Sequence, residues 1–269
     1  MAVVGLQRVD ALLNIVRAYL PRQVESTGDF EDWQVVAPAL IAIAADLFEG
    51  MMGGVPPRGR LRAEVLARSL AEYVISFAWL AAADEDQLRL RLRQFLKDEY
   101  LEREKGENKL RDQIGGRAPY RYLFDPATSR PGGPLPSALL DDQNRERLRQ
   151  LKADSRIPNL PNTFDMAFAA DARWMPEIDL VAHNPFALTY FTVFTGPSFM
   201  THPSVTAVAA VTLGAPPNLV VGAPHSLGSS ETPYGQALLS FLNMLLIASR
   251  TLGWPAEEDV RAAVDPSAA

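Results

Sequence analysis

The sequence predicts an all-α fold, mostly a helical bundle, with a small β-hairpin near residues 205–221. Three observations predict it. Apolar residues recur at three- and four-residue spacing over most of the chain. Clusters of Gly and Pro separate these segments. Two of the predicted helices are apolar on nearly every face, which is typical of helices in the middle of a core.

The length and composition fit one globular body. The chain has 269 residues, of which 48% are hydrophobic, and a chain of this size can bury a large core. We therefore expect a single helical domain over residues 1–269. Within it, residues 115–136 are rich in Gly, Pro and aromatic residues and predict a long internal loop, while residues 265–269 predict a frayed tail.

Charge and cysteine content exclude several classes of function. The net charge is −6, so nucleic acid is not an expected partner. There are no cysteines, which excludes disulfides, thiolate chemistry and Cys-ligated metals. The N-terminal residues lack a basic region followed by an apolar one, so we expect a cytoplasmic protein without membrane association. Whether it forms a homo-oligomer is left open.

The helices can be placed from periodicity and from helix breakers. Asp29 is the expected N-cap of the second helix, and Asn162 or Thr163 that of the sixth. We place the helix of residues 60–83 at the centre, and the charged helix that follows it at the surface. The predicted helices cover residues 6–20, 29–49, 60–83, 84–112, 137–155, 163–173, 185–199 and 234–252, with Gln236 and Asn243 as inward polar side chains of the last one.

One long stretch is free of charge. No Asp, Glu, Lys or Arg occurs between Leu180 and Ser230, although 22% of the chain is charged. All three histidines, His183, His202 and His225, fall within it. Such a stretch predicts a segment that runs through the interior, with hydrogen-bonded polar groups.

Arg68 and Glu72 are the charged pair to be explained. They are four residues apart and so share one face of the central helix. A carboxylate within an apolar helix must be paired or protonated, because burying it alone costs several kcal/mol. We expect Glu72 to be buried beside Arg68 or a histidine. The pair either joins helices in the core or forms part of a functional site.

His202 is the strongest candidate for proton transfer. It lies in a Thr-His-Pro-Ser turn between an aromatic helix and a strand, where an imidazole can stand at the mouth of a cavity. Asp46 and Glu49 could add carboxylates nearby, but no metal-ligand spacing is present, so no metal is predicted. No phosphate-binding glycine motif occurs either, so no cofactor is expected.

Two motifs together carry a resemblance. The segment Ala67-Arg68-Ser69-Leu70-Ala71-Glu72-Tyr73, followed later by Tyr190 and by His202-Pro203-Ser204, resembles a family of helical bacterial proteins known only as a domain of unknown function. In that family an Arg-Ser-Leu-x-Glu helix and a Tyr…Ser…His-x-Ser segment recur. The resemblance implies an all-α fold and polar site positions at Arg68, Glu72, Tyr190, His202 and Ser204. Where the family has a serine before the histidine, the corresponding residue of this chain is either Thr195 or Ser198.

Three functional hypotheses follow. In the first, Arg68, Tyr190 and Ser204 bind a small polar or anionic ligand, while Glu72 and His202 orient it or exchange protons. In the second, the protein is a metal-independent ribonuclease of the HEPN type found in toxin and defence systems, although the Arg-x₄₋₆-His signature of that class is absent. In the third, the polar residues form a structural network in an interaction protein. Whether the protein is an enzyme is left open.

Overall fold

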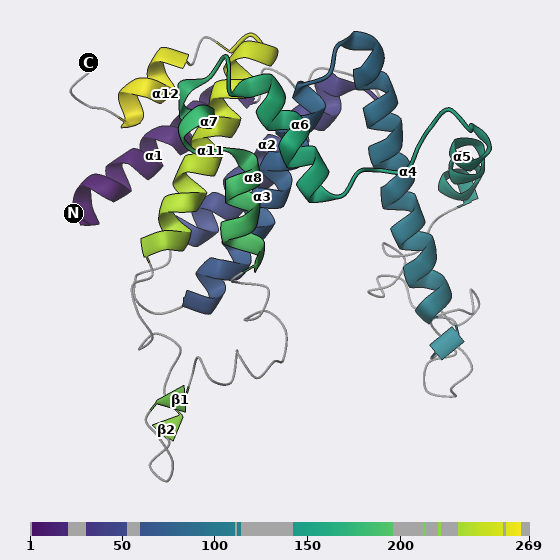
Figure 1. Ribbon diagram of the computed structural model, residues 1–269, viewed down its shortest axis with the longest axis horizontal. Coiled ribbons are helices and arrows are strands. Elements are labelled where there is room, and N and C mark those ends of the chain that lie inside the picture. Colours follow the sequence, from purple (N-terminus) through teal and green to yellow (C-terminus); the bar gives the residue numbers. More distant parts are fainter. Residues whose placement is uncertain are drawn as a thin grey trace. The chain divides into compact units, whose positions relative to one another are not determined.

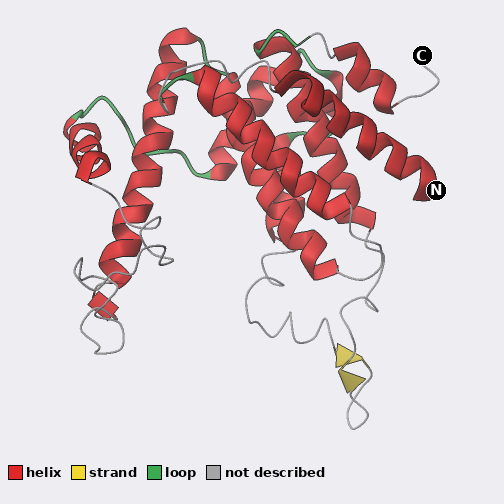
Figure 2. Ribbon diagram, turned by 180° about the vertical axis from the view of Figure 1, so that it is seen from behind, coloured by secondary structure: helices red, strands yellow, loops and turns green. Residues whose placement is uncertain are grey.

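A computed structural model of the chain describes residues 2–20, 31–52, 60–110, 112–113, 142–195, 212–213, 220–221, 231–254 and 257–264. The described residues are mostly helical (Figure 2), which confirms the all-α class. Residue contacts group the chain into two compact units. The large unit comprises Met1–Asp84 and Pro161–Ala269, and the small unit is Glu85–Leu160. Each is described here by itself.

The large unit contains most of the helices (Figure 1). Its α-helices are α1 (Ala2–Tyr19), α2 (Trp33–Met52), α3 (Arg60–Ala81), α6 (Thr163–Trp174), α7 (Asp179–His183), α8 (Phe186–Tyr190), α11 (Glu231–Thr251) and α12 (Glu257–Val264). A π-helical turn, η4 (Phe191–Thr195), continues α8 without a break. The short helices α7 and α12 were not anticipated from the sequence.

Helix α3 is the centre of the large unit, as its apolar sequence predicts. It packs against α2, α11, α6, α8 and η4. Its second half is buried almost continuously, from Leu70 to Leu80, with Val74, Ile75 and Phe77 fully inaccessible. Helix α11 supplies the facing layer, in which Phe241 stacks on Phe48 of α2 with ring centroids 4.4 Å apart. This core holds the helices that carry the candidate site.

Trp174 fastens α6 to α3. The indole is 2% exposed, and its Nε1–H donates a hydrogen bond of 3.0 Å to the backbone oxygen of Ala78. A buried indole that finds an acceptor contributes apolar area without leaving a polar atom unpaired. The contact fixes the C-terminal end of α6, just before the chain turns into α7.

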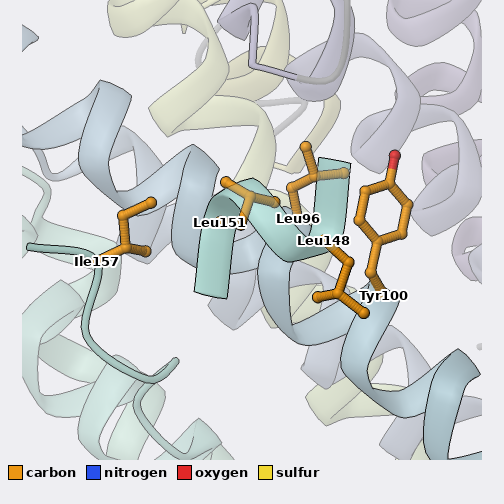
Figure 3. Packing of buried hydrophobic residues seen from close by; sticks show 5 residues of the cluster. All are labelled: Leu96, Tyr100, Leu148, Leu151 and Ile157. Atoms are coloured by element: carbon orange, nitrogen blue, oxygen red, sulfur yellow. The ribbon is translucent and has the colours of Figure 1, made fainter. Parts of the chain in front are cut away.

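The small unit pairs α4 (Glu85–Leu110) with α5 (Asp142–Ala153). Figure 3 shows its core, which consists of Leu96, Tyr100, Leu148, Leu151 and Ile157. Ion pairs surround this small core: Arg145 contacts Glu107 at 2.6 Å and Lys152 contacts Glu104 at 2.6 Å. The charged pattern of α4 therefore serves partly to hold α5, and not only to solvate an outer face.

Capping side chains mark the starts of α2 and α6. The start of α2 differs from the one expected at Asp29. Helix α2 begins at Trp33, where Asp32 accepts a hydrogen bond from the N–H of Gln34 at 2.8 Å. The predicted cap, Asp29, lies outside the described residues. At α6 the cap is Asn162 and not Thr163, since the Asn162 side chain accepts from the N–H of Asp165 at 2.9 Å.

Only four residues of the region near the expected β-hairpin are described. Strands β1 (Thr212–Leu213) and β2 (Val220–Val221) pair antiparallel, with Thr212 opposite Val221. The rest of residues 205–221 lies outside the described residues, so a hairpin over that range stays a prediction. The expected loop at 115–136 and the expected tail at 265–269 lie outside them as well.

Helix α2 is long and apolar enough to cross a membrane. Its most apolar window has a mean hydropathy of 1.8, and half of that window is buried within the protein. One such helix is weak evidence for a membrane span, since core helices pass the same test, and α2 packs against α3 and α11.

Candidate functional site

Arg68 and Glu72 do form a pair on α3. Arg68 Nε lies 3.6 Å from Glu72 Oε1. The two side chains are 29% and 45% exposed, so the expected deep burial of Glu72 is wrong. Its face of α3 is only partly covered by neighbouring elements. The pair lies at the edge of the core, where solvent and ligands can reach it.

The carboxylate of Glu72 is held in a partly desolvated setting. Burial raises the pKa of Glu72 above its ordinary value, although the charge of Arg68 and a hydrogen bond from it act in the opposite direction. Desolvation therefore outweighs the arginine. A carboxyl group of this kind holds a proton more readily than a free one, which suits either proton exchange or hydrogen bonding to a ligand.

Tyr190 lies in the same cluster, one ring away from Arg68. The Arg68 guanidinium is placed over the ring of Phe194, 4.9 Å from its centroid. Phe194 in turn stacks on Tyr190, with centroids 4.4 Å apart and planes 20° apart. The structure thus brings together three of the five predicted site residues, linked through Phe194.

His202 and Ser204 are not placed by the structure. Both lie outside the described residues, as does His225. The described histidine, His183, is at the end of α7 with its side chain 74% exposed, and its Nδ1 lies 2.8 Å from the backbone oxygen of Asp179. His183 therefore lies at the surface, although the charge-free stretch that contains it was predicted to run through the interior.

The charge-free stretch is less buried than predicted. Between residues 180 and 194, Val181, Phe186, Thr189 and Val193 are buried, but Leu188 and Phe191 are each 47% exposed. Residues 180–194 therefore run along the surface of the large unit with one side facing the core. In this stretch, the absence of charged residues goes with exposed apolar side chains as well as with buried ones.

An aromatic group surrounds Tyr190 and was not anticipated. Phe164 of α6 lies 5.4 Å from Tyr190 and 5.0 Å from Phe191, and it meets Phe168 edge-on at 4.6 Å. The π-turn η4 carries Phe191 and Phe194. π-Helical turns occur frequently at functional sites, and this one supplies the ring that holds Arg68.

Asp171 holds the start of α8, the helix that carries Tyr190. The sequence analysis did not single it out. Its carboxylate accepts hydrogen bonds from the backbone N–H groups of Phe186 at 2.7 Å and Ala187 at 3.0 Å. Burial raises the pKa of Asp171, and the two backbone hydrogen bonds oppose that rise. The available signal was one Asp within the apolar run of α6, the same signal that drew attention to Glu72.

A second set of buried hydrogen bonds involves Asn184, Thr189 and Asn243. Asn184 donates to Thr189 Oγ1 at 3.3 Å, and Asn243 of α11 donates to the backbone oxygen of Asn184 at 3.3 Å. All three residues are nearly inaccessible. The expectation that Asn243 points inward is confirmed. This network holds α7, α8 and α11 together and contains neither Arg68 nor Glu72.

Carboxylates do not gather into a metal site in the described part of the chain. No group of three or more His, Asp or Glu residues is suited to a metal ion there. Glu49 contacts Arg17 at 3.1 Å and is more than half exposed, and Asp46 is exposed. Neither is recorded in contact with Arg68 or Glu72.

Fold and site together define a helical protein with an arginine–glutamate–aromatic cluster on its surface. No protein-family model, no curated protein and no solved structure matches the chain. The resemblance to a bacterial domain family therefore stays a prediction.

Proposed function

We propose that the protein binds a small polar or anionic ligand at the cluster of Arg68, Glu72 and Tyr190. The observation that carries the proposal is the set of contacts made by the Arg68 guanidinium. Its contacts within the described part of the chain are the one between Nε and Glu72 and the one with the Phe194 ring. Neither Nη group has a contact with another described residue, and the proposal assigns both to the ligand.

The chemistry of a stacked guanidinium fits an anion. Its planar fork matches the two oxygens of a carboxylate or phosphate. Stacking on Phe194 restricts the rotation of the fork, which reduces the entropy lost when an anion binds. Glu72 does not satisfy Arg68 completely, because the 3.6 Å contact between them is longer than a good hydrogen bond.

His202 and Ser204 belong to the proposal as sequence candidates. They follow η4 in the chain, and η4 already carries Phe194 to Arg68. In this proposal His202 exchanges a proton with the ligand and Ser204 binds it. The HEPN-like ribonuclease alternative requires the same His202 as acid–base, with Arg68 on the phosphate, and no described contact favours it over simple binding.

The test is anion binding by the full chain and by two matched variants. Isothermal titration calorimetry would follow inorganic phosphate and citrate as probes. Arg173 is the control, because it also stacks on an aromatic ring, Trp174, at 4.7 Å and also pairs with a glutamate four residues later, Glu177. Arg68→Gln should weaken binding by about tenfold or more, the equivalent of one charge-assisted hydrogen bond.

Arg173→Gln should change the dissociation constant by less than about twofold. Saturable binding that is lost only in Arg68→Gln supports the proposal. Equal effects of the two variants would show that the anion responds to overall charge and not to this site, and absence of saturation with both probes would contradict the proposal for these anions.

A structural and interaction role is the second candidate function, and a specific observation favours it. Asn184, Thr189 and Asn243 form a buried polar network, which is what a structural or interaction protein of this kind requires. The network does not include Arg68. An interaction protein also needs an exposed apolar surface, and the large unit has one.

A further inference from the structure

Exposed apolar side chains are concentrated on one face of the large unit. Among the described residues, six large hydrophobic side chains are exposed. Four of them come from α6 and its C-cap and from α8 and η4: Phe168 (52%), Met175 (38%), Leu188 (47%) and Phe191 (47%). We call these four residues the α6–η4 face. Scattered exposed hydrophobics are ordinary, whereas a gathered set marks an interaction surface.

The residues of each helix share a side. Phe168 and Met175 are seven positions apart, as are two residues on one side of an α-helix, and Leu188 and Phe191 are three apart. The two helices are neighbours, because α6 packs against α8. Phe164 joins them by touching both Phe168 and Phe191. Phe168 and Phe191 are therefore joined through Phe164, and Met175 and Leu188 extend the face along their own helices.

This face is held rigid from within. Phe164 fixes the rings of Phe168 and Phe191 edge-on, and Asp171 ties the start of α8 to α6. Trp174 ties the end of α6 to the central helix. Aromatic anchors that are already ordered lose little entropy on binding, which is a property of interface hot spots.

The large unit, which carries the face, is acidic as a whole. The large unit contains 10 Lys and Arg against 19 Asp and Glu, a net charge of −9, while the small unit contains 16 against 13, a net charge of +3. Asp165 lies three residues before Phe168, and Asp179 begins α7 with 83% of its side chain exposed. Two cations belong to the same region: Arg173 of α6 pairs with Glu177, and Arg68, which contacts Phe194 of η4, pairs with Glu72.

We propose that the α6–η4 face docks a basic amphipathic helix of a partner protein. The apolar stripe of that helix would cover Phe168, Leu188 and Phe191, and its Lys and Arg side chains would lie beside Asp165 and Asp179. This goes beyond ligand binding at Arg68, since it uses other side chains and the opposite sign of charge. It is also independent of His202.

The test uses the full chain and two synthetic helices of about 18 residues. One carries Leu on one side and Lys on the other; its counterpart replaces Lys by Glu. Fluorescence anisotropy of labelled peptide gives the affinity. The Lys peptide should bind at least about tenfold more tightly than the Glu peptide, and added salt should weaken it.

The variant Phe168→Ser/Phe191→Ser should reduce Lys-peptide affinity by about tenfold or more. The control is Ile43→Ser on α2, which removes a side chain of similar exposure, 42%, from a different surface; it should change affinity less than about twofold. Circular dichroism of each variant establishes that it is folded. Equal binding of the two peptides, or equal effects of the two variants, would overturn the proposal.

Two other occupants give distinct results. If a second copy of the chain covers the face, sedimentation velocity will show a dimer that Phe168→Ser/Phe191→Ser dissociates, and no peptide will bind at dimer concentrations. If a lipid surface covers it, the wild type will float with vesicles of phosphatidylcholine and phosphatidylserine and the double variant will not. Either result overturns the peptide proposal.

Discussion

Asp171 accepts a hydrogen bond of 2.7 Å from the backbone N–H of Phe186, a residue 15 positions further along the chain. A second bond, from Ala187, satisfies another of the orphan donors at the start of α8. Helix α8 has no side-chain cap of its own, because Pro185 occupies the N-cap position. The start of the helix that carries Tyr190 is therefore defined by a residue of another helix.

Removing this carboxylate should destabilise the large unit markedly. Asp171→Ala leaves one buried and one partly buried N–H group without an acceptor, and we expect a loss of about 2–4 kcal/mol in the free energy of unfolding. Urea denaturation followed by circular dichroism measures it. Asp179→Ala, on an exposed side chain, is the control and should change stability by less than about 0.5 kcal/mol. Equal losses of stability in the two variants would show that the hydrogen bonds of Asp171 have no special role in holding the start of α8.

Glu72 gives a pH dependence whose sign can be stated. Its folded pKa lies above the ordinary value of 4.5, so above pH 4.5 the folded state binds more protons than the unfolded state. The stability it contributes is present below that pH and is lost as the pH rises through the folded pKa. The loss should stay below about 1 kcal/mol, because the side chain is half-exposed.

The measurement compares the wild type with Glu72→Gln by urea denaturation from about pH 4 to about pH 7. The stability of the wild type minus that of Glu72→Gln should fall over this window. A rise would mean that the ion pair with Arg68 dominates over burial, which is the opposite of the order found here.

Two glycines should respond to alanine with opposite signs. Gly253 has a φ of +66°, and no atom lies within 4 Å of where a Cβ would be. Gly253→Ala should therefore cost about 1 kcal/mol through backbone conformation alone. Gly235 lies within α11, also with open space around it, so Gly235→Ala should stabilise by about 0.5–1 kcal/mol. Thermal unfolding of both variants tests this, and a shared sign would refute it.

We expect the small unit to unfold locally while the large unit stays folded. Its core is the five-residue cluster of Figure 3. Leu148→Ala should cost about 2–4 kcal/mol locally, and hydrogen exchange with mass spectrometry should show faster exchange in α4 and α5 but not in α3. The matched variant Leu246→Ala on α11 should accelerate exchange in the large unit. If Leu148→Ala accelerates exchange equally in α3, the two units unfold as one.

The sequence predicted the helices that are long and strongly patterned. Helix α3 was placed at the centre because residues 69–83 contain a single charge, and the structure confirms it. Short helices escaped detection: α7 has five residues and no capping side chain. Within so few residues, tertiary contacts decide the backbone, and periodicity has no room to appear.

The candidate site was predictable only in part. The i,i+4 spacing of Arg68 and Glu72 was enough to predict their pairing, but not that Glu72 is half-exposed, because exposure depends on which neighbours cover that side of α3. The contact between Arg68 and Phe194 depends on a π-turn, for which sequence periodicity gives no signal. Asp171 acts on residues 15 and 16 positions away, and no local pattern encodes such a bond.

The indole of Trp174, buried against Ala78, has a practical consequence. All four tryptophans of the chain, Trp33, Trp79, Trp174 and Trp254, belong to the large unit. Selective excitation of indole emission therefore reports on that unit alone, whereas far-ultraviolet dichroism reports on every helix. Comparing the two optical signals during denaturation would separate the melting of the two units in the unmodified protein, with no label attached.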